Sequence, residues 1–397
     1  MMKIKNILFF LLFSGSSVII NAQSITRLDK SRASFEFLDL TIHSLMKKAH
    51  VHGMAISIFN NNIPVYTKTF GYKKLDTKDS LETNTNIYGA SLSKSLFATL
   101  VMMLVEDGII DLDKPLQEYL PRPVYEYTPE TKWHDDFSSL KNDSNYHKIT
   151  ARMCLAHTAG FPNWRWFEED QKLKVKFPPG TKYNYSGEGM VYLQVVLEKM
   201  LGRSLEDLMK EKIFDPLGMK NSSYTWQPAF ENNFSYGHTI NGELYKKDKD
   251  NEARSASTLE TTLDDYTLFL KAILNFELLN PTTTSEMFRP QVRINTIQQF
   301  GPLSLKNSTT NDNIQLSYGL GWGLLQSPYG KGAFKEGHGD GFQHYSIIFP
   351  DTGIGILIMS NSDNAESIFK YLLEETIGDV YTPWYWENYI PFDHSSD

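Results

Sequence analysis

Apolar positions follow two different spacings along the chain, and each spacing predicts its own elements. Residues 27–50 carry apolar side chains at helical spacing, which predicts an amphipathic helix. Residues 53–59 and 63–72 are rich in strand-forming residues and flank three asparagines, which predicts a hairpin. Residues 91–106 form a helical run that is apolar on nearly all sides and ends before Gly108. The N-terminal part therefore supplies strands and a buried helix.

Strand character returns only near the end of the chain. Residues 343–349 and 354–360 flank a strong Pro-Asp-Thr-Gly turn signal, and residues 364–376 are helical again. This order predicts an α+β fold, with an antiparallel β-sheet formed from N- and C-terminal strands and flanked by helices. A largely helical insertion is expected over roughly residues 91–254.

The two ends of the chain carry further patterns. Residues 1–22 combine two lysines, a continuous apolar run and a small residue, Ala22, at a plausible cleavage point, so we expect a signal peptide. The alternative is a membrane anchor, but the interrupted apolar stretch spans about 14 residues where a spanning helix needs roughly 20. We expect one domain over residues 23–380, exported to the periplasm or secreted, with no stable membrane anchor. The aromatic tail at 381–397 is interpreted as a strap over apolar surface rather than a binding site.

Composition excludes several classes of protein. The net charge of −8 argues against a nucleic-acid binder, and signal cleavage would make it −10 by removing two lysines. A single cysteine, Cys154, forms no internal disulfide, and its apolar neighbours favour a buried residue over a nucleophile. The histidines show no metal-ligand spacing, and G-x-S-x-G, H-E-x-x-H and P-loop motifs are absent. We expect no metal and no cofactor.

The remaining chemical motif is S-x-x-K, which occurs four times. Ser91 and Lys94 stand out because they open the buried helical run, where free N–H groups favour a developing oxyanion. Burial would also lower the pKa of Lys94 and let it act as a base. The other three serines, Ser44, Ser138 and Ser367, lie in amphipathic helices or in a polar loop.

The sequence around Ser91 resembles the serine β-lactamase and penicillin-binding protein superfamily. It is most similar to the class C β-lactamase branch, which also contains D-alanyl-D-alanine carboxypeptidases and esterases. The resemblance covers most of residues 50–375. The stretches that carry it are residues 89–94, 106–121, 149–161, 178–196, 213–224, 318–324 and 338–364.

The resemblance implies a second motif, Tyr-x-Asn, which reads Tyr185-Ser186-Gly187 here. It gives Tyr185 a share in proton transfer with Lys94, and whether Lys94 or Tyr185 takes the Ser91 proton stays open. Gly187 departs from the family pattern, because glycine has no amide to offer to a substrate.

The resemblance also implies a third motif, Lys-Thr-Gly or His-x-Gly, which we match to His338-Gly339-Asp340. By position, the N–H of Gly341 would then join that of Ser91 in an oxyanion hole. Asp340 would disfavour substrates that carry a carboxylate. His344 lies further along the same strand and is interpreted as structural.

These residues predict an exported serine hydrolase that forms an acyl-enzyme on Ser91. Its substrate is expected to be a small molecule or a peptide with an ester or amide bond, and β-lactams are included among the amides. The alternatives are a D-alanyl-D-alanine carboxypeptidase and a catalytically silent ligand-binding homologue. The aromatic residues of segment 121–149 either line the substrate cleft or pack a surface loop, namely Tyr125, Tyr127, Trp133 and Phe137.

Overall fold

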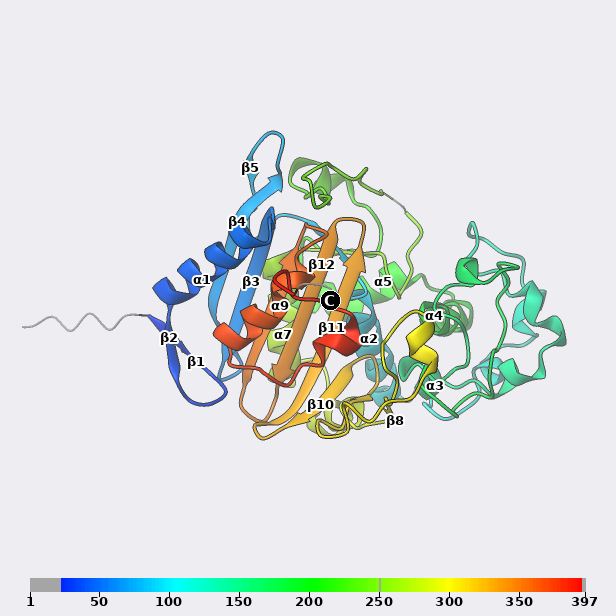
Figure 1. The fold of residues 1–397 in the computed structure, drawn as a ribbon. Coiled ribbons are helices and arrows are strands. Elements are labelled where there is room, and N and C mark those ends of the chain that lie inside the picture. Colours follow the sequence, from blue (N-terminus) through cyan, green and yellow to red (C-terminus); the bar gives the residue numbers. More distant parts are fainter. Residues whose placement is uncertain (1–22, 250, 395–397) are drawn as a thin grey trace, which may run out of the picture.

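A nine-stranded antiparallel sheet dominates the part of the chain that the computed structural model describes, residues 23–249 and 251–394 (Figure 1). Strands from both ends of the sequence meet in it, because β3 pairs with β13. The strand order is β5 (Asp79–Ser80), β4 (Ile63–Lys74), β3 (Gly53–Asn60), β13 (Ile354–Ser360), β12 (Phe342–Phe349), β11 (Gly330–Gly339), β10 (Gly323–Ser327), β9 (Ser317–Tyr318) and β8 (Val292–Arg293). The predicted α+β fold and its antiparallel sheet are confirmed.

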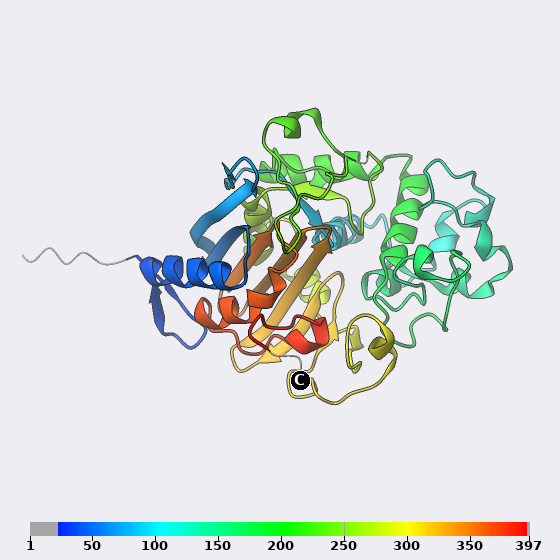
Figure 2. The same cartoon turned by 45° about the horizontal axis from the view of Figure 1, so that its top comes forward.

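Helices cover both faces of this sheet, and each face has its own apolar core (Figure 2). Side chains alternate along β3, so that Met54, Ile56 and Ile58 join one core while Ala55 and Phe59 join the other. The helices α1 (Phe35–Lys48) and α9 (Glu366–Glu375) pack on the first face. The helices α2 (Ser93–Glu106) and α7 (Leu263–Leu274) pack on the second face.

The segment between the β-rich ends, residues 91–254, contributes no strand to the large sheet in its described part and consists of helices joined by long irregular stretches. It begins with α2, whose residues 93–102 are all buried, as the apolar run predicted. A short ladder of β6 (Ile87–Ala90) and β7 (Leu259–Thr261) brackets the segment. The further α-helices of the chain are α3 (Ala151–Leu155), α4 (Gly187–Leu201), α5 (Leu205–Met209), α6 (Asp215–Leu217), α8 (Pro281–Met287) and α10 (Trp384–Glu387).

The predicted helix over 27–50 begins later than expected. A small hairpin of β1 (Ser24–Thr26) and β2 (Arg32–Ser34) comes first, and α1 starts at Phe35. The hydroxyl of Ser34 accepts a hydrogen bond from the N–H of Phe37 and so caps the N-terminus of α1. Strand β2 ends at the same residue. The expected signal peptide, residues 1–22, lies outside the described residues.

The aromatic tail crosses the α9 side of the sheet. Trp384, Trp386 and Tyr389 are buried against the first core, as expected of a strap over apolar surface. The tail also holds a loop near the end of β11, since the N–H of Gln299 donates to the Trp386 carbonyl at 2.8 Å. The indole N–H of Trp386 donates to the Thr296 hydroxyl at 3.0 Å. The tail therefore fixes the loop 294–300.

Candidate active site

Ser91 lies in the turn that joins β6 to α2, with its side chain partly exposed. Lys94 is 1% exposed, and its Nζ lies 2.9 Å from the Ser91 Oγ and 2.7 Å from the Ala256 carbonyl oxygen. The preceding Ala90 has a φ of +48°, a left-handed conformation that is uncommon for alanine. The turn therefore presents a serine hydroxyl to a lysine that is almost completely removed from water.

Tyr185 meets this pair from the segment that leads into α4. The Lys94 Nζ lies 4.8 Å from the centre of its ring, and the Lys335 Nζ donates to its hydroxyl at 3.2 Å. Ser186 caps α4, since its hydroxyl accepts from the N–H of Gly189, and its own N–H donates to the Nδ1 of His157. These contacts fix the backbone on either side of Tyr185.

The environments of Lys94 and Tyr185 favour the uncharged form of each. Burial holds the pKa of Lys94 well below its ordinary value, the Lys335 charge lowers it further, and Glu336 opposes both effects. Burial and the Glu336 carboxylate hold the pKa of Tyr185 well above its ordinary value, while a hydrogen bond with Ser91 acts in the opposite direction. Both pKa shifts favour the neutral form of the group that faces the serine.

Lys335 and Glu336 are site residues that the sequence prediction missed. The Lys335 Nζ lies 2.8 Å from the Glu336 Oε1, which also accepts from the Gln299 side chain at 3.1 Å. All three side chains are buried. The missed signal is the string Lys335-Glu336-Gly337, a Lys-x-Gly motif that begins three residues before the predicted His-x-Gly.

The strand β11 passes directly against the Ser91 turn at this motif. A Cβ on Gly337 would lie 2.8 Å from the Gly89 carbonyl oxygen and 3.3 Å from the Leu92 Cγ. Only a residue without a side chain fits this approach, so the third position of the Lys-x-Gly motif requires glycine. Gly337 therefore holds the third position of this motif, which the sequence prediction had given to Asp340.

His338 and Asp340 take other positions than the prediction gave them. The Nδ1 of His338 lies 2.7 Å from the Oε1 of Glu366 on α9, on the opposite face of the sheet from α2. That carboxylate raises the pKa of His338. Asp340 is exposed in the turn between β11 and β12. Neither side chain is brought to Ser91.

The N–H of Gly341 does not fit the predicted oxyanion role, because it donates to the Asp363 Oδ1 at 2.8 Å. The geometry offers a different donor on the same strand. Gly339 and Phe342 close a two-residue turn, and backbone groups alternate in direction along a strand. The N–H of His338 therefore points away from β12, toward the edge of β11 that β10 leaves unpaired beyond Phe334.

Trp164 occupies the space beside Gly187, where the family pattern has asparagine. A Cβ on Gly187 would lie 2.5, 2.6 and 2.8 Å from three ring carbons of Trp164. This indole stacks on Trp166 with a centroid distance of 4.7 Å and meets Trp133 edge-on at 5.9 Å. An aromatic cluster therefore replaces the side-chain amide.

His344, Cys154, Phe137 and Tyr125 have structural surroundings. His344 is buried, with its Nε2 2.7 Å from the Tyr88 carbonyl oxygen, and burial lowers its pKa to about 4. Cys154 is buried, and burial raises the pKa of its thiol. Phe137 and Tyr125 pack into the second core, so within segment 121–149 they support a packed loop rather than a cleft wall.

Two general features of the described residues bear on the class of protein. Within residues 23–249 and 251–394, no group of three or more His, Cys, Asp and Glu side chains could hold a metal ion. Over the same part of the chain, every helix is too short or too polar to cross a membrane.

Known proteins are similar to this chain in both fold and sequence. The family model described as Beta-lactamase matches residues 38–375. The chain is 26% identical over 360 residues to penicillin-binding protein 4* of Bacillus subtilis, which covers 82% of this chain and 71% of that protein. It is 30% identical over 183 residues to the lovastatin esterase of Penicillium rubens, covering 40% of this chain and 45% of that protein.

A solved structure described as the D-alanine carboxypeptidase AmpC of Burkholderia cenocepacia superposes with a TM-score of 0.66 at 20% identity. The superposition covers 86% of this chain and 98% of that one. The family match extends over most of the sequence, so the chain belongs to the Beta-lactamase family and is a serine hydrolase.

Proposed function

We propose that this protein hydrolyses carboxylic esters through an acyl-enzyme on Ser91. The observation that carries the proposal is the 2.9 Å approach of the Lys94 Nζ to the Ser91 Oγ, in a buried site that lowers the pKa of Lys94 and so favours its neutral form. Neutral Lys94 is the base that takes the Ser91 proton, because a phenolate at Tyr185 is disfavoured by burial and by Glu336. Ser91 then attacks the carbonyl carbon of the substrate.

The tetrahedral intermediate is held by backbone donors. The N–H of Ser91 and the N–H of His338 form the oxyanion hole. His338, on the edge of β11 that passes the Ser91 turn, takes the role that the sequence had predicted for Gly341. The proton on Lys94 passes by way of the Tyr185 hydroxyl to the leaving oxygen, and the alcohol departs. Water then attacks the acyl carbon while Lys94 takes the water proton. The bond between the acyl carbon and the Ser91 Oγ breaks, Lys94 returns the proton to Oγ, and the carboxylic acid departs.

An ester is favoured over a β-lactam or a D-alanyl peptide for two reasons. The amide that the Tyr-x-Asn motif would offer to the substrate is missing at Gly187, and Trp164 fills its place. The charge of Lys335 is also already balanced by Glu336 at 2.8 Å, so a substrate carboxylate would meet a neutral pair. The lovastatin esterase among the relatives is consistent with ester chemistry on this sequence pattern. Export through the signal at residues 1–22 is part of the proposal.

Labelling with a fluorophosphonate tests the nucleophile. Wild type is expected to label, Ser91→Ala is not, and Ser138→Ala serves as a matched control because it changes an exposed serine of another S-x-x-K string. Hydrolysis of p-nitrophenyl acetate should fall by at least about 10³-fold in Ser91→Ala. Equal labelling of wild type and Ser91→Ala would refute the assignment, and no labelling of either would favour a silent ligand-binding homologue.

A substrate panel tests the ester preference. p-Nitrophenyl esters should be turned over with a higher kcat/KM than a chromogenic cephalosporin or a D-Ala-D-Ala peptide. A preference for the peptide would establish the carboxypeptidase alternative instead.

A further inference from the structure

The loop 294–300 touches two groups of the proposed active site with two consecutive residues. The Gln299 side chain is 4% exposed, and its Nε2 donates to the Glu336 Oε1 at 3.1 Å. The ring centre of Phe300 lies 5.1 Å from that of Tyr185, and the two ring planes meet at 76°. The loop is therefore a wall of the site, although the mechanism given above uses none of its residues.

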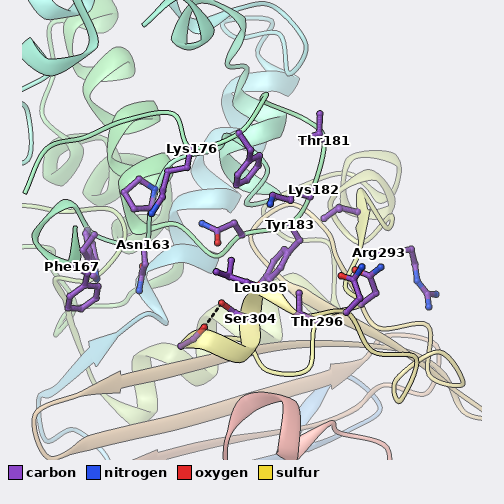
Figure 3. Close-up of a pocket in the computed structure, with 18 of the residues that line it drawn as sticks. Asn163, Phe167, Lys176, Thr181, Lys182, Tyr183, Arg293, Thr296, Ser304 and Leu305 are labelled. Atoms are coloured by element: carbon purple, nitrogen blue, oxygen red, sulfur yellow. Dashed lines mark hydrogen bonds between the residues drawn. The ribbon is translucent and has the colours of Figure 1, made fainter. Parts of the chain in front are cut away.

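The position of this loop depends on the C-terminal tail. A cavity of about 760 Å³ adjoins the loop at Thr296 and Gly301 (Figure 3), and a hollow supplies no packing contacts. The anchors of the loop lie in the tail instead. The Gln299 N–H donates to the Trp386 carbonyl oxygen at 2.8 Å, and the Trp386 indole donates to the Thr296 hydroxyl at 3.0 Å. Because Trp386 is 1% exposed, a buried residue of the tail sets where Gln299 lies.

The Gln299 amide binds the same carboxylate oxygen that Lys335 binds. The Glu336 Oε1 accepts from the Lys335 Nζ at 2.8 Å as well as from Gln299, and all three side chains are buried. Burial raises the pKa of Glu336, but the Lys335 charge and the Gln299 amide outweigh burial and bring that pKa below its ordinary value. Glu336 is thus held as a carboxylate, with one oxygen fixed between two donors.

Lys335 in turn orients the hydroxyl of Tyr185. The Lys335 Nζ donates to this hydroxyl at 3.2 Å, so the phenol oxygen accepts on that side and directs its own hydrogen elsewhere. That hydrogen points toward Ser91, with which Tyr185 also shares a hydrogen bond. Lysine has a flexible four-carbon stem, so its ammonium stays on Tyr185 only while Glu336 stays in place.

We propose that Gln299 is a positioning residue for the proton transfer through Tyr185. Its amide fixes Glu336, and Glu336 keeps Lys335 on the Tyr185 hydroxyl. The tail sets the place of Gln299 through Trp386, so it serves catalysis as well as covering apolar surface. This inference rests on the proposed function, because it concerns the step in which Tyr185 protonates the leaving oxygen.

Two acetate esters with different leaving groups test the proposal. p-Nitrobenzyl acetate releases an alkyl alcohol that needs a proton in order to depart, whereas p-nitrophenyl acetate releases a stable phenolate. Gln299→Met removes the amide and keeps the length of the side chain. It should lower kcat/KM for p-nitrobenzyl acetate roughly tenfold, because displacing a proton donor is costly, and should change p-nitrophenyl acetate less than about twofold. A merely structural role would lower both values equally.

Two further variants support the comparison. Gln298→Met is the matched control, because the Gln298 Nε2 makes an exposed hydrogen bond of 3.1 Å from the same loop to the Asn388 Oδ1 of the tail. It should alter the hydrolysis of neither ester. Gln299→Asn keeps an amide but shortens the side chain by one methylene, and it should show the same selective loss, also where Gln299→Met does not fold.

Three results would overturn the positioning role. They are equal losses for the two esters in the Gln299 variants, wild-type kcat/KM for p-nitrobenzyl acetate in either folded variant, and the same selective loss in Gln298→Met. Failure of the proposed function itself would look different. The wild type would then hydrolyse neither ester, or it would label with fluorophosphonate no better than Ser91→Ala.

Discussion

Restoring asparagine at position 187 is expected to fail unless Trp164 is removed at the same time. In Gly187→Asn, the new Cβ would lie 2.5 Å from the indole, well inside a normal carbon contact. Trp164 cannot shift freely, because it stacks on Trp166 and meets Trp133 edge-on. Overpacking of this kind costs about 1–3 kcal/mol in the free energy of unfolding. In the Trp164→Ala background, the same substitution should cost less than about 0.5 kcal/mol.

The double variant Trp164→Ala/Gly187→Asn also makes a functional prediction. Its asparagine can offer a hydrogen bond to a substrate amide, and such a bond contributes about 1 kcal/mol, which is roughly fivefold in rate. Turnover of a chromogenic cephalosporin should therefore rise about fivefold relative to Trp164→Ala, while p-nitrophenyl acetate changes little. Urea denaturation of the four proteins gives the coupling energy.

Two results would refute this reasoning. Gly187→Asn as stable as wild type would show that the indole does not restrict position 187. Identical cephalosporin turnover in Trp164→Ala and in the double variant would show that the missing amide does not limit amide recognition.

Three further predictions follow from the charges around the site. Glu336→Gln removes a carboxylate that raises the pKa of Lys94, so the acidic limb of the pH profile of kcat/KM should move to lower pH. If this limb does not move, Lys94 is not the general base. Glu188→Gln breaks a buried, doubly hydrogen-bonded ion pair with Arg165 and should lower the free energy of unfolding by about 3–5 kcal/mol, whereas a loss below about 1 kcal/mol in urea denaturation would contradict this. Asp340→Gly should raise kcat/KM for carboxylated esters by about two- to fivefold relative to neutral esters at low ionic strength, and the gain should vanish in 1 M salt because Asp340 is exposed; equal effects on both substrates would remove the charge argument.

The sequence predicted those strands and helices well in which the apolar residues follow either strand spacing or helical spacing clearly. Strands β3, β4, β12 and β13 and helices α2 and α9 lie where the strand-forming and apolar patterns predicted them, whereas the pairing of β3 with β13 is seen only in the structure. The start of α1 was wrong because its apolar spacing continued into the β1–β2 hairpin. A short edge hairpin leaves almost no periodic signal.

The third motif shows a different limit of the sequence. Both Lys335-Glu336-Gly337 and His338-Gly339-Asp340 match a short family pattern, and spacing alone does not choose between them. The choice depends on which residue of β11 lies against the Ser91 turn. The contact of Gly337 with Gly89 decides this, and the pairing of His338 with Glu366 excludes the alternative for its side chain.

The sequence by itself predicted the fold class from local periodicity and the family from a resemblance that covers most of the chain. It also predicted the pairing of Ser91 with Lys94, because these residues lie three positions apart in one chain segment. Only the tertiary structure decided that Lys335 and its Glu336 partner lie beside Tyr185 and that Trp164 fills the space beside Gly187. Each of these joins segments separated by more than twenty residues or depends on which face of a strand a side chain takes. The packing of one segment on another sets such relations, and linear spacing does not contain them.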